Sequence, residues 1–111
     1  MTHLEKAIAS AYGTDPYLGT PDPRTIAAIA SLVEFMCEVS KRRPVAYANE
    51  SWLTQSAHDQ FEHMVKHADT AWYSVDTGEC SGIDDDGLPH AAHAALRIAF
   101  GLVRLQQEDG K

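Results

Sequence analysis

Apolar residues recur at the spacing of an α-helix along three long segments, and this periodicity limits the fold more than any other feature of the sequence. Equivalent stripes run through residues 23–40, 52–75 and 90–105. The first of them is made by Ile26, Ile29, Ala30, Val33 and Cys37. Nowhere do apolar and polar residues alternate over a stretch long enough to require a β-sheet. We therefore predict an all-α helical bundle of three main helices.

Proline, glycine and capping residues mark the ends of the predicted helices. Thr2 and Glu5 have the spacing of a capping box and predict a short N-terminal helix that ends near Gly13. Three of the five prolines fall in residues 14–23, which we expect to form a loop. Asp22 before Pro23 favours the start of the second helix.

The third helix should begin at about Trp52, with Asn49 or Ser51 as its cap. We expect one domain over residues 1–111, in which residues 1–22 form an accessory helix and loop and residues 23–107 form the core.

Composition excludes several classes of protein. Sixteen Asp and Glu residues against nine Lys and Arg give a formal net charge of -7, which disfavours direct nucleic-acid binding and attraction to an anionic membrane. Cys37 and Cys80 form no CxxC pair, so we expect no zinc ribbon and a reduced cytoplasmic setting. No segment has the pattern of a signal peptide or of a membrane span.

The second predicted helix also carries apolar residues outside its main stripe. Leu32, Phe35 and Met36 widen its apolar surface beyond what one packing partner covers. A chain of 111 residues can bury only a modest core by itself. We therefore expect a homo-oligomer.

The segment 78–105 combines an acidic turn with the start of the last helix. Three aspartates, Asp84 to Asp86, lie just before His90 and His93 on the first helical turn. Carboxylates favour a divalent cation, and a helix N-terminus favours an anion, so the segment is a candidate metal and phosphate site. The alternative is a solvated, helix-capping loop with surface histidines.

Three further groups have spacings that suit a metal or a phosphate. Each also has an ordinary interpretation as a solvated helix face. Glu34 and Glu38 lie one turn apart, as do His63 and His67, and Arg97 lies one turn beyond His93. Paired carboxylates can hold a cation, paired imidazoles can hold a metal or a phosphate, and an arginine can bind phosphoryl oxygens.

Taken together, these motifs resemble the small phage-type dATP/dGTP diphosphohydrolase family. The resemblance spans Leu18 to Leu105 and is most specific in DDDGLPHAAHAAL. Three further segments match the family in chain order: PRTIAAIASLVEF, the connection with Lys41, Tyr47, Asn49 and Trp52, and the Lys66-His67 pair. The chain departs from the family pattern in three ways: a longer segment between His67 and His90, Asp86 in place of a serine, and the insertion RRPVA between Lys and Tyr.

The resemblance implies hydrolysis of a purine deoxynucleoside triphosphate to the monophosphate and pyrophosphate, with Mg or Mn, in a phage or bacterial cytosol. The candidate metal ligands are Glu34, Glu38, Asp84, Asp85 and Asp86. The candidate catalytic residues are Glu79, His90 and His93, and the candidate substrate-binding residues are Lys41, Trp52, His63, His67 and Arg97, with Tyr47 as an alternative for stacking on the base.

Two other interpretations stay open. The pair His58-Asp59 is similar to the signature of HD-type phosphohydrolases, although only His3 lies upstream as the further histidine that this class requires. The other is a non-enzymatic phage or prophage accessory protein that binds a nucleotide or a host protein through the helical scaffold.

Overall fold

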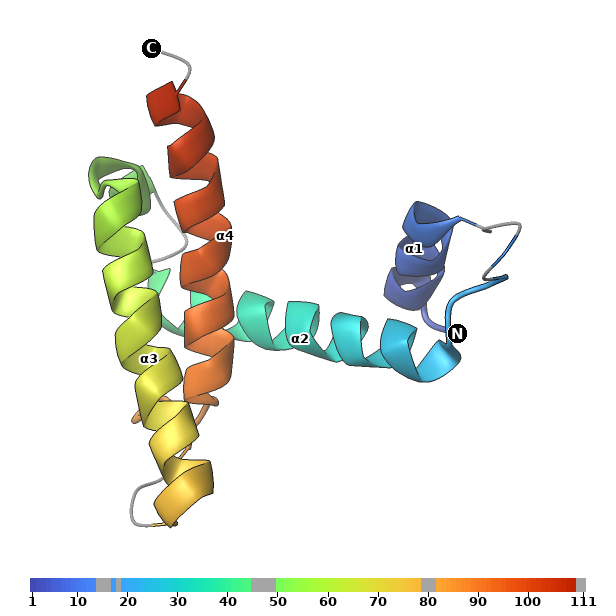
Figure 1. The fold of residues 1–111 in the computed structure, drawn as a ribbon, viewed down its shortest axis with the longest axis horizontal. Helices are drawn as coiled ribbons and strands as arrows, with labels where there is room; N and C mark the ends of the chain where they lie inside the picture. The colour runs from blue at the N-terminus through green and yellow to red at the C-terminus, as the bar shows by residue number, and fades with distance from the viewer. Residues whose placement is uncertain (14–16, 18, 45–49, 79–81, 110–111) are drawn as a thin grey trace. The chain divides into compact units, whose positions relative to one another are not determined.

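The computed structural model describes residues 1–13, 17, 19–44, 50–78 and 82–109 and confirms the all-α fold (Figure 1). The helices are α1 (His3–Tyr12), α2 (Pro23–Arg42), the short 3₁₀ helix η2 (Glu50–Thr54), α3 (Ala57–Thr77) and α4 (His90–Asp109). The described residues contain no β-strand, and Ile83 and Pro89 form an isolated bridge. None of the helices in this part of the chain has both the length and the apolar composition needed to cross a membrane.

Local signals placed the first two helices correctly. The predicted capping box is present, because the Thr2 hydroxyl accepts from the Glu5 amide and the Glu5 carboxylate accepts from the Thr2 amide. α2 begins at Pro23, and the Asp22 carboxylate accepts a hydrogen bond of 2.8 Å from the Arg24 amide. This carboxylate satisfies an amide that the helix itself leaves without a partner.

The predicted start of the third helix is wrong. Its N-cap is Ser56, whose hydroxyl accepts from the Asp59 amide, and the segment before it forms the separate helix η2. The Gln60 side-chain amide donates to the Trp52 carbonyl at 2.9 Å. This bond holds η2 against the first turn of α3, and the extended backbone of Ser56 separates the two helices.

The chain divides into two compact units, Met1–Glu34 and Phe35–Lys111. In the first unit Ile26 and Ala30 are buried. In the second unit a core forms where α4 meets the end of α2 and the turn before α4; it consists of Val39, Leu88, Ala92 and Leu96, with Met36 and Phe100 packed against it.

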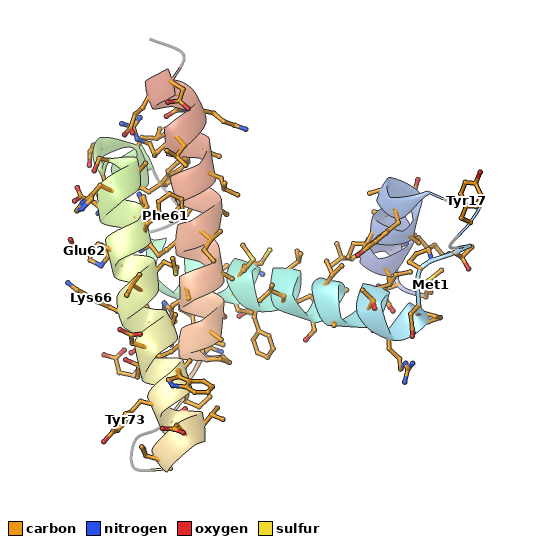
Figure 2. All side chains as sticks on the ribbon, in the orientation of Figure 1. Met1, Tyr17, Phe61, Glu62, Lys66 and Tyr73 are labelled. Carbon is orange, nitrogen blue, oxygen red and sulfur yellow. The ribbon has the colours of Figure 1, made fainter. Side chains whose placement is uncertain are left out.

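Helices α3 and α4 lie side by side and run antiparallel (Figure 1). Glu62, Lys66 and Tyr73 lie on the side of α3 that faces away from α4, and Phe61 lies between the two helices (Figure 2). Gly101 is the contact point on α4, because a Cβ atom there would lie 2.7 Å from Phe61 Cζ. The missing side chain lets the two helices approach closely.

Replacing Gly101 by Ala should therefore lower the free energy of unfolding by about 1 kcal/mol. Overpacking costs about 1–3 kcal/mol, and the better helix propensity of Ala offsets part of that cost. Urea denaturation would measure the change. In a Phe61→Leu background the same substitution should cost nothing; equal costs in both backgrounds would contradict this packing.

Candidate metal centre

The acidic turn before α4 is held by its own backbone. The Asp84 amide donates to the Leu88 carbonyl at 2.8 Å, and the Gly87 amide donates to the Asp84 carbonyl at 2.9 Å. Gly87 has φ +81°, a left-handed conformation that favours glycine. The Asp86 carboxylate accepts from the Leu88 amide at 3.0 Å. The turn therefore presents the carboxylates of Asp84 and Asp86 at the start of α4.

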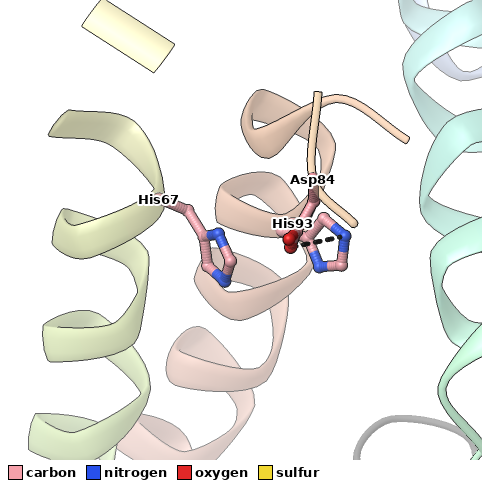
Figure 3. A group of neighbouring side chains, drawn as sticks. All are labelled: His67, Asp84 and His93. Atoms are coloured by element: carbon pink, nitrogen blue, oxygen red, sulfur yellow. Dashed lines mark ion pairs between the residues drawn. The ribbon is translucent and has the colours of Figure 1, made fainter. Parts of the chain in front are cut away.

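Three elements bring a carboxylate and two imidazoles together. His67 comes from α3, His93 from the first turn of α4, and Asp84 from the turn (Figure 3). One donor atom of each lies within 4.8 Å of the others. His93 Nε2 lies 3.4 Å from Asp84 Oδ2 and 2.8 Å from Asp86 Oδ2. We call His67, Asp84 and His93 the metal cluster.

The histidines of this cluster are packed against one another. The rings of His67 and His93 are stacked with centroids 4.8 Å apart, and His67 Nδ1 lies 2.9 Å from Nδ1 of His90. His93 is completely buried, so the alternative of a surface histidine is wrong for this residue. His90 Nδ1 lies 3.9 Å from Asp84 Oδ2, which places all three imidazoles around one carboxylate.

Burial keeps His67 neutral. It lowers the pKa of His67 from 6.5 to about 4, and positive charge on His93 or His90 acts in the same direction. Burial acts to raise the pKa of Asp84, but the Asp85 amide donor and the neighbouring histidines outweigh it, so the pKa of Asp84 is lowered. A neutral imidazole beside an ionised carboxylate is the form that binds a metal.

The lowered pKa of His67 predicts a loss of stability in mild acid for the metal-free protein. At pH values between the ordinary pKa of 6.5 and the folded value of about 4, His67 is protonated in the unfolded chain and neutral in the folded chain. Stability should therefore fall as the pH drops through this interval. Of the groups near His67, the carboxylates of Asp84 and Asp86 also have a lowered pKa, but they contribute only below their ordinary value of 3.8, whereas the lowered pKa of His63 acts with the same sign as that of His67.

The measurement is urea denaturation at about pH 7 and about pH 5, for the wild type and for His67→Asn. The variant should lose less stability between the two conditions, because Asn does not titrate. Identical losses would show that His67 is not held neutral.

Arg43, the residue just after α2, contacts all three aspartates of the turn. Its Nε lies 3.3 Å from Asp86 Oδ2, and its Nη2 pairs with Asp85 and lies 3.7 Å from Asp84 Oδ2. The Arg42 guanidinium donates to the Asp86 backbone carbonyl. The end of α2 thus offsets the charge of the acidic turn.

A second buried polar group lies one turn beyond His93. Arg97 is 6% exposed, and its Nη1 donates to the side-chain oxygens of Gln55 at 2.9 Å and Gln60 at 2.8 Å. Trp52 stacks on Phe100 with ring centroids 4.5 Å apart, so one face of its indole is covered. These residues join η2 and α3 to α4, one to two turns along α4 from His93.

The remaining candidates lie outside the metal cluster or outside the described residues. Glu38 pairs with Lys41 at 3.4 Å and with Arg42 at 4.0 Å, and Glu34 is exposed on α2. His63 is half-buried on α3, and burial together with the charge of Arg97 lowers its pKa. Glu79 and Tyr47 lie outside the described residues.

The His58-Asp59 pair lies on the first turn of α3. Its two side chains are exposed and 3.8 Å apart. His67 is nine residues further along the same helix, roughly 13 Å along its axis. The structure therefore separates this pair from the metal cluster.

Sequence reasoning did not single out Arg43, Gln55 or Gln60. The basic run KRRP marked a charged connection, but its spacing did not show which of the three cations reaches the turn. The two glutamines carry no charge and fit no motif, so only the structure shows that they accept hydrogen bonds from the buried Arg97.

Neither a family model, nor a curated protein, nor a solved structure matches this chain.

Proposed function

We propose that the protein is a metal-dependent hydrolase of a purine deoxynucleoside triphosphate, dATP or dGTP, that releases the monophosphate and pyrophosphate. The observation that carries the proposal is the metal cluster, in which His67, Asp84 and His93 offer donor atoms within 4.8 Å of one another. The resemblance of the same segment to the diphosphohydrolase family supplies the reaction and the substrate.

The donor set suits a transition metal better than it suits Mg. Mg prefers oxygen ligands, whereas imidazole nitrogen suits Zn, Cu, Fe and Ni, and Mn binds most weakly among the first-row divalent ions. Of the two metals that the resemblance implies, Mn is the transition metal. Two of the three donors are imidazoles, and both come from largely buried side chains. A bound metal would activate water and offset charge on the phosphates.

The residues around the cluster have distinct proposed roles. His90 touches His67 and faces Asp84 but is not a member of the cluster, so it is our candidate for the general base. Asp86 Oδ2 lies 2.8 Å from His93 Nε2 and would orient this ring if a metal bound the other ring nitrogen, Nδ1, because a carboxylate that orients a ligand histidine accepts from the nitrogen that the metal leaves free. Lys41, Trp52 and His63 remain proposed substrate contacts, whereas the Arg97 guanidinium is buried and already donates to Gln55 and Gln60.

Incubating the pure protein with each of the four dNTPs, in Mn and separately in Mg, would test the proposal. We expect monophosphate and pyrophosphate from dATP or dGTP, faster in Mn, and none after chelation of the metal. Binding of Mn without products from any dNTP would contradict the enzymatic reaction and favour a nucleotide-binding accessory protein.

A further inference from the structure

We infer that Arg43 binds the phosphates of the substrate and that Asp85 holds the Nη2 group of its guanidinium until a phosphate replaces it. This inference rests on the proposed function, because a phosphate bound at the metal cluster would lie next to Arg43. It assigns a role to a residue that no sequence motif marked, and it assigns Asp85 a role other than metal ligand.

Two nitrogens of the Arg43 guanidinium have different surroundings. Its Nε faces Asp86, whose side chain is 9% exposed and is also held by the Leu88 amide and His93. Its Nη2 pairs with Asp85, whose side chain is 82% exposed. The first contact fixes the guanidinium in place, while the second lies in solvent.

A solvent-exposed ion pair contributes little free energy, so the Asp85 contact can be exchanged. Arginine offers parallel N–H donors that match two phosphate oxygens, and it binds them more strongly than it binds a single exposed carboxylate. Nη2 also lies 3.7 Å from Asp84 Oδ2, the carboxylate of the metal cluster. A phosphate held by a metal at Asp84 would therefore lie within reach of Nη2.

Lys41 is less suited to this role. Its ammonium pairs with Glu38 at 3.4 Å, and its side chain is 73% exposed. Lys41 contacts Glu38 on its own helix, whereas Arg43 contacts the aspartates of the acidic turn. Of the two, Arg43 is the one that contacts the acidic turn.

The experiment is calorimetric titration of inorganic pyrophosphate into the Mn-loaded protein, after the affinity for Mn alone has been measured. Arg43→Gln should weaken pyrophosphate binding by about tenfold, because it removes a charge-assisted contact. Asp85→Asn should tighten it by about two- to fivefold, because it frees the guanidinium from an exposed pair.

The double variant distinguishes replacement of Asp85 by a phosphate at Arg43 from a general effect of removing one negative charge. In the Arg43→Gln background, Asp85→Asn should give no further tightening, since the guanidinium that it releases is gone. Glu108→Gln is the matched control, because it removes one carboxylate from the pair with Arg104 at a point roughly 22 Å along α4 from His93. It should leave pyrophosphate binding unchanged.

Several results would overturn the inference. One is that Asp85→Asn still raises the affinity for pyrophosphate when Arg43 has been replaced by Gln. Another is that an Arg43→Gln protein which still binds Mn has an unchanged affinity for pyrophosphate. Failure of the Mn-loaded wild type to bind pyrophosphate would overturn it as well, and failure to bind Mn would remove the proposed function together with it. Pyrophosphate binding with the expected pattern but without dNTP turnover would support the phosphate site and contradict only the hydrolase.

Discussion

Replacing Asp84 by Asn should lower the affinity for Mn by about 100-fold or more and abolish dNTP hydrolysis. Its carboxylate is the one anionic donor of the metal cluster, and three imidazoles surround it. Loss of a residue that only orients a ligand costs about 10- to 100-fold in metal affinity, so loss of a ligand should cost at least as much. Calorimetry with Mn and product analysis would measure both effects.

Asp85→Asn is the control for this prediction. It makes the same chemical change one residue away, on a side chain that is 82% exposed and pairs with Arg43. Its effect on Mn affinity should be small, which would separate the two neighbours that the sequence offered as equal candidates. Equal losses in the two variants would mean that the acidic turn attracts the metal by its net charge and that the cluster geometry is wrong.

Replacing Arg97 by Met should lower the free energy of unfolding by about 2–4 kcal/mol. Methionine fills most of the space but leaves the side-chain oxygens of Gln55 and Gln60 without their donor. Gln60 is completely buried, so water cannot substitute for the lost bond. An unsatisfied buried polar group costs about 1–3 kcal/mol, and bonds from a charged donor are the stronger ones.

Urea denaturation would measure this loss. Arg24→Met is the control, because its side chain is 91% exposed and its removal should change stability by no more than about 0.5 kcal/mol. A single Arg97→Met variant as stable as the wild type would show that the network is not a structural support.

Short-range sequence signals predicted much of the fold. The capping box at Thr2, the start of α2 at Pro23 and the start of α4 after Pro89 each depend on residues within one helical turn. The start of α3 was predicted wrongly although its signal is also local, because Ser56 caps the helix by accepting from the Asp59 amide. The prediction placed the cap at Asn49 or Ser51, and a cap residue before Trp52 looks the same in the sequence whether an α-helix or the short helix η2 follows it.

Some residues of the candidate site are likewise brought together by local sequence, and others are brought in by contacts between helices. Local sequence is enough to bring Asp84, Asp86, His90 and His93 close together, because they occupy one turn and the helix that follows it. Packing between helices selects the residues that join them. The antiparallel packing of α3 on α4 brings His67 to His93, and the end of α2 brings Arg43 to the aspartates. Spacing along the chain specifies neighbours on one helix, whereas contacts between helices depend on which faces pack and in what register.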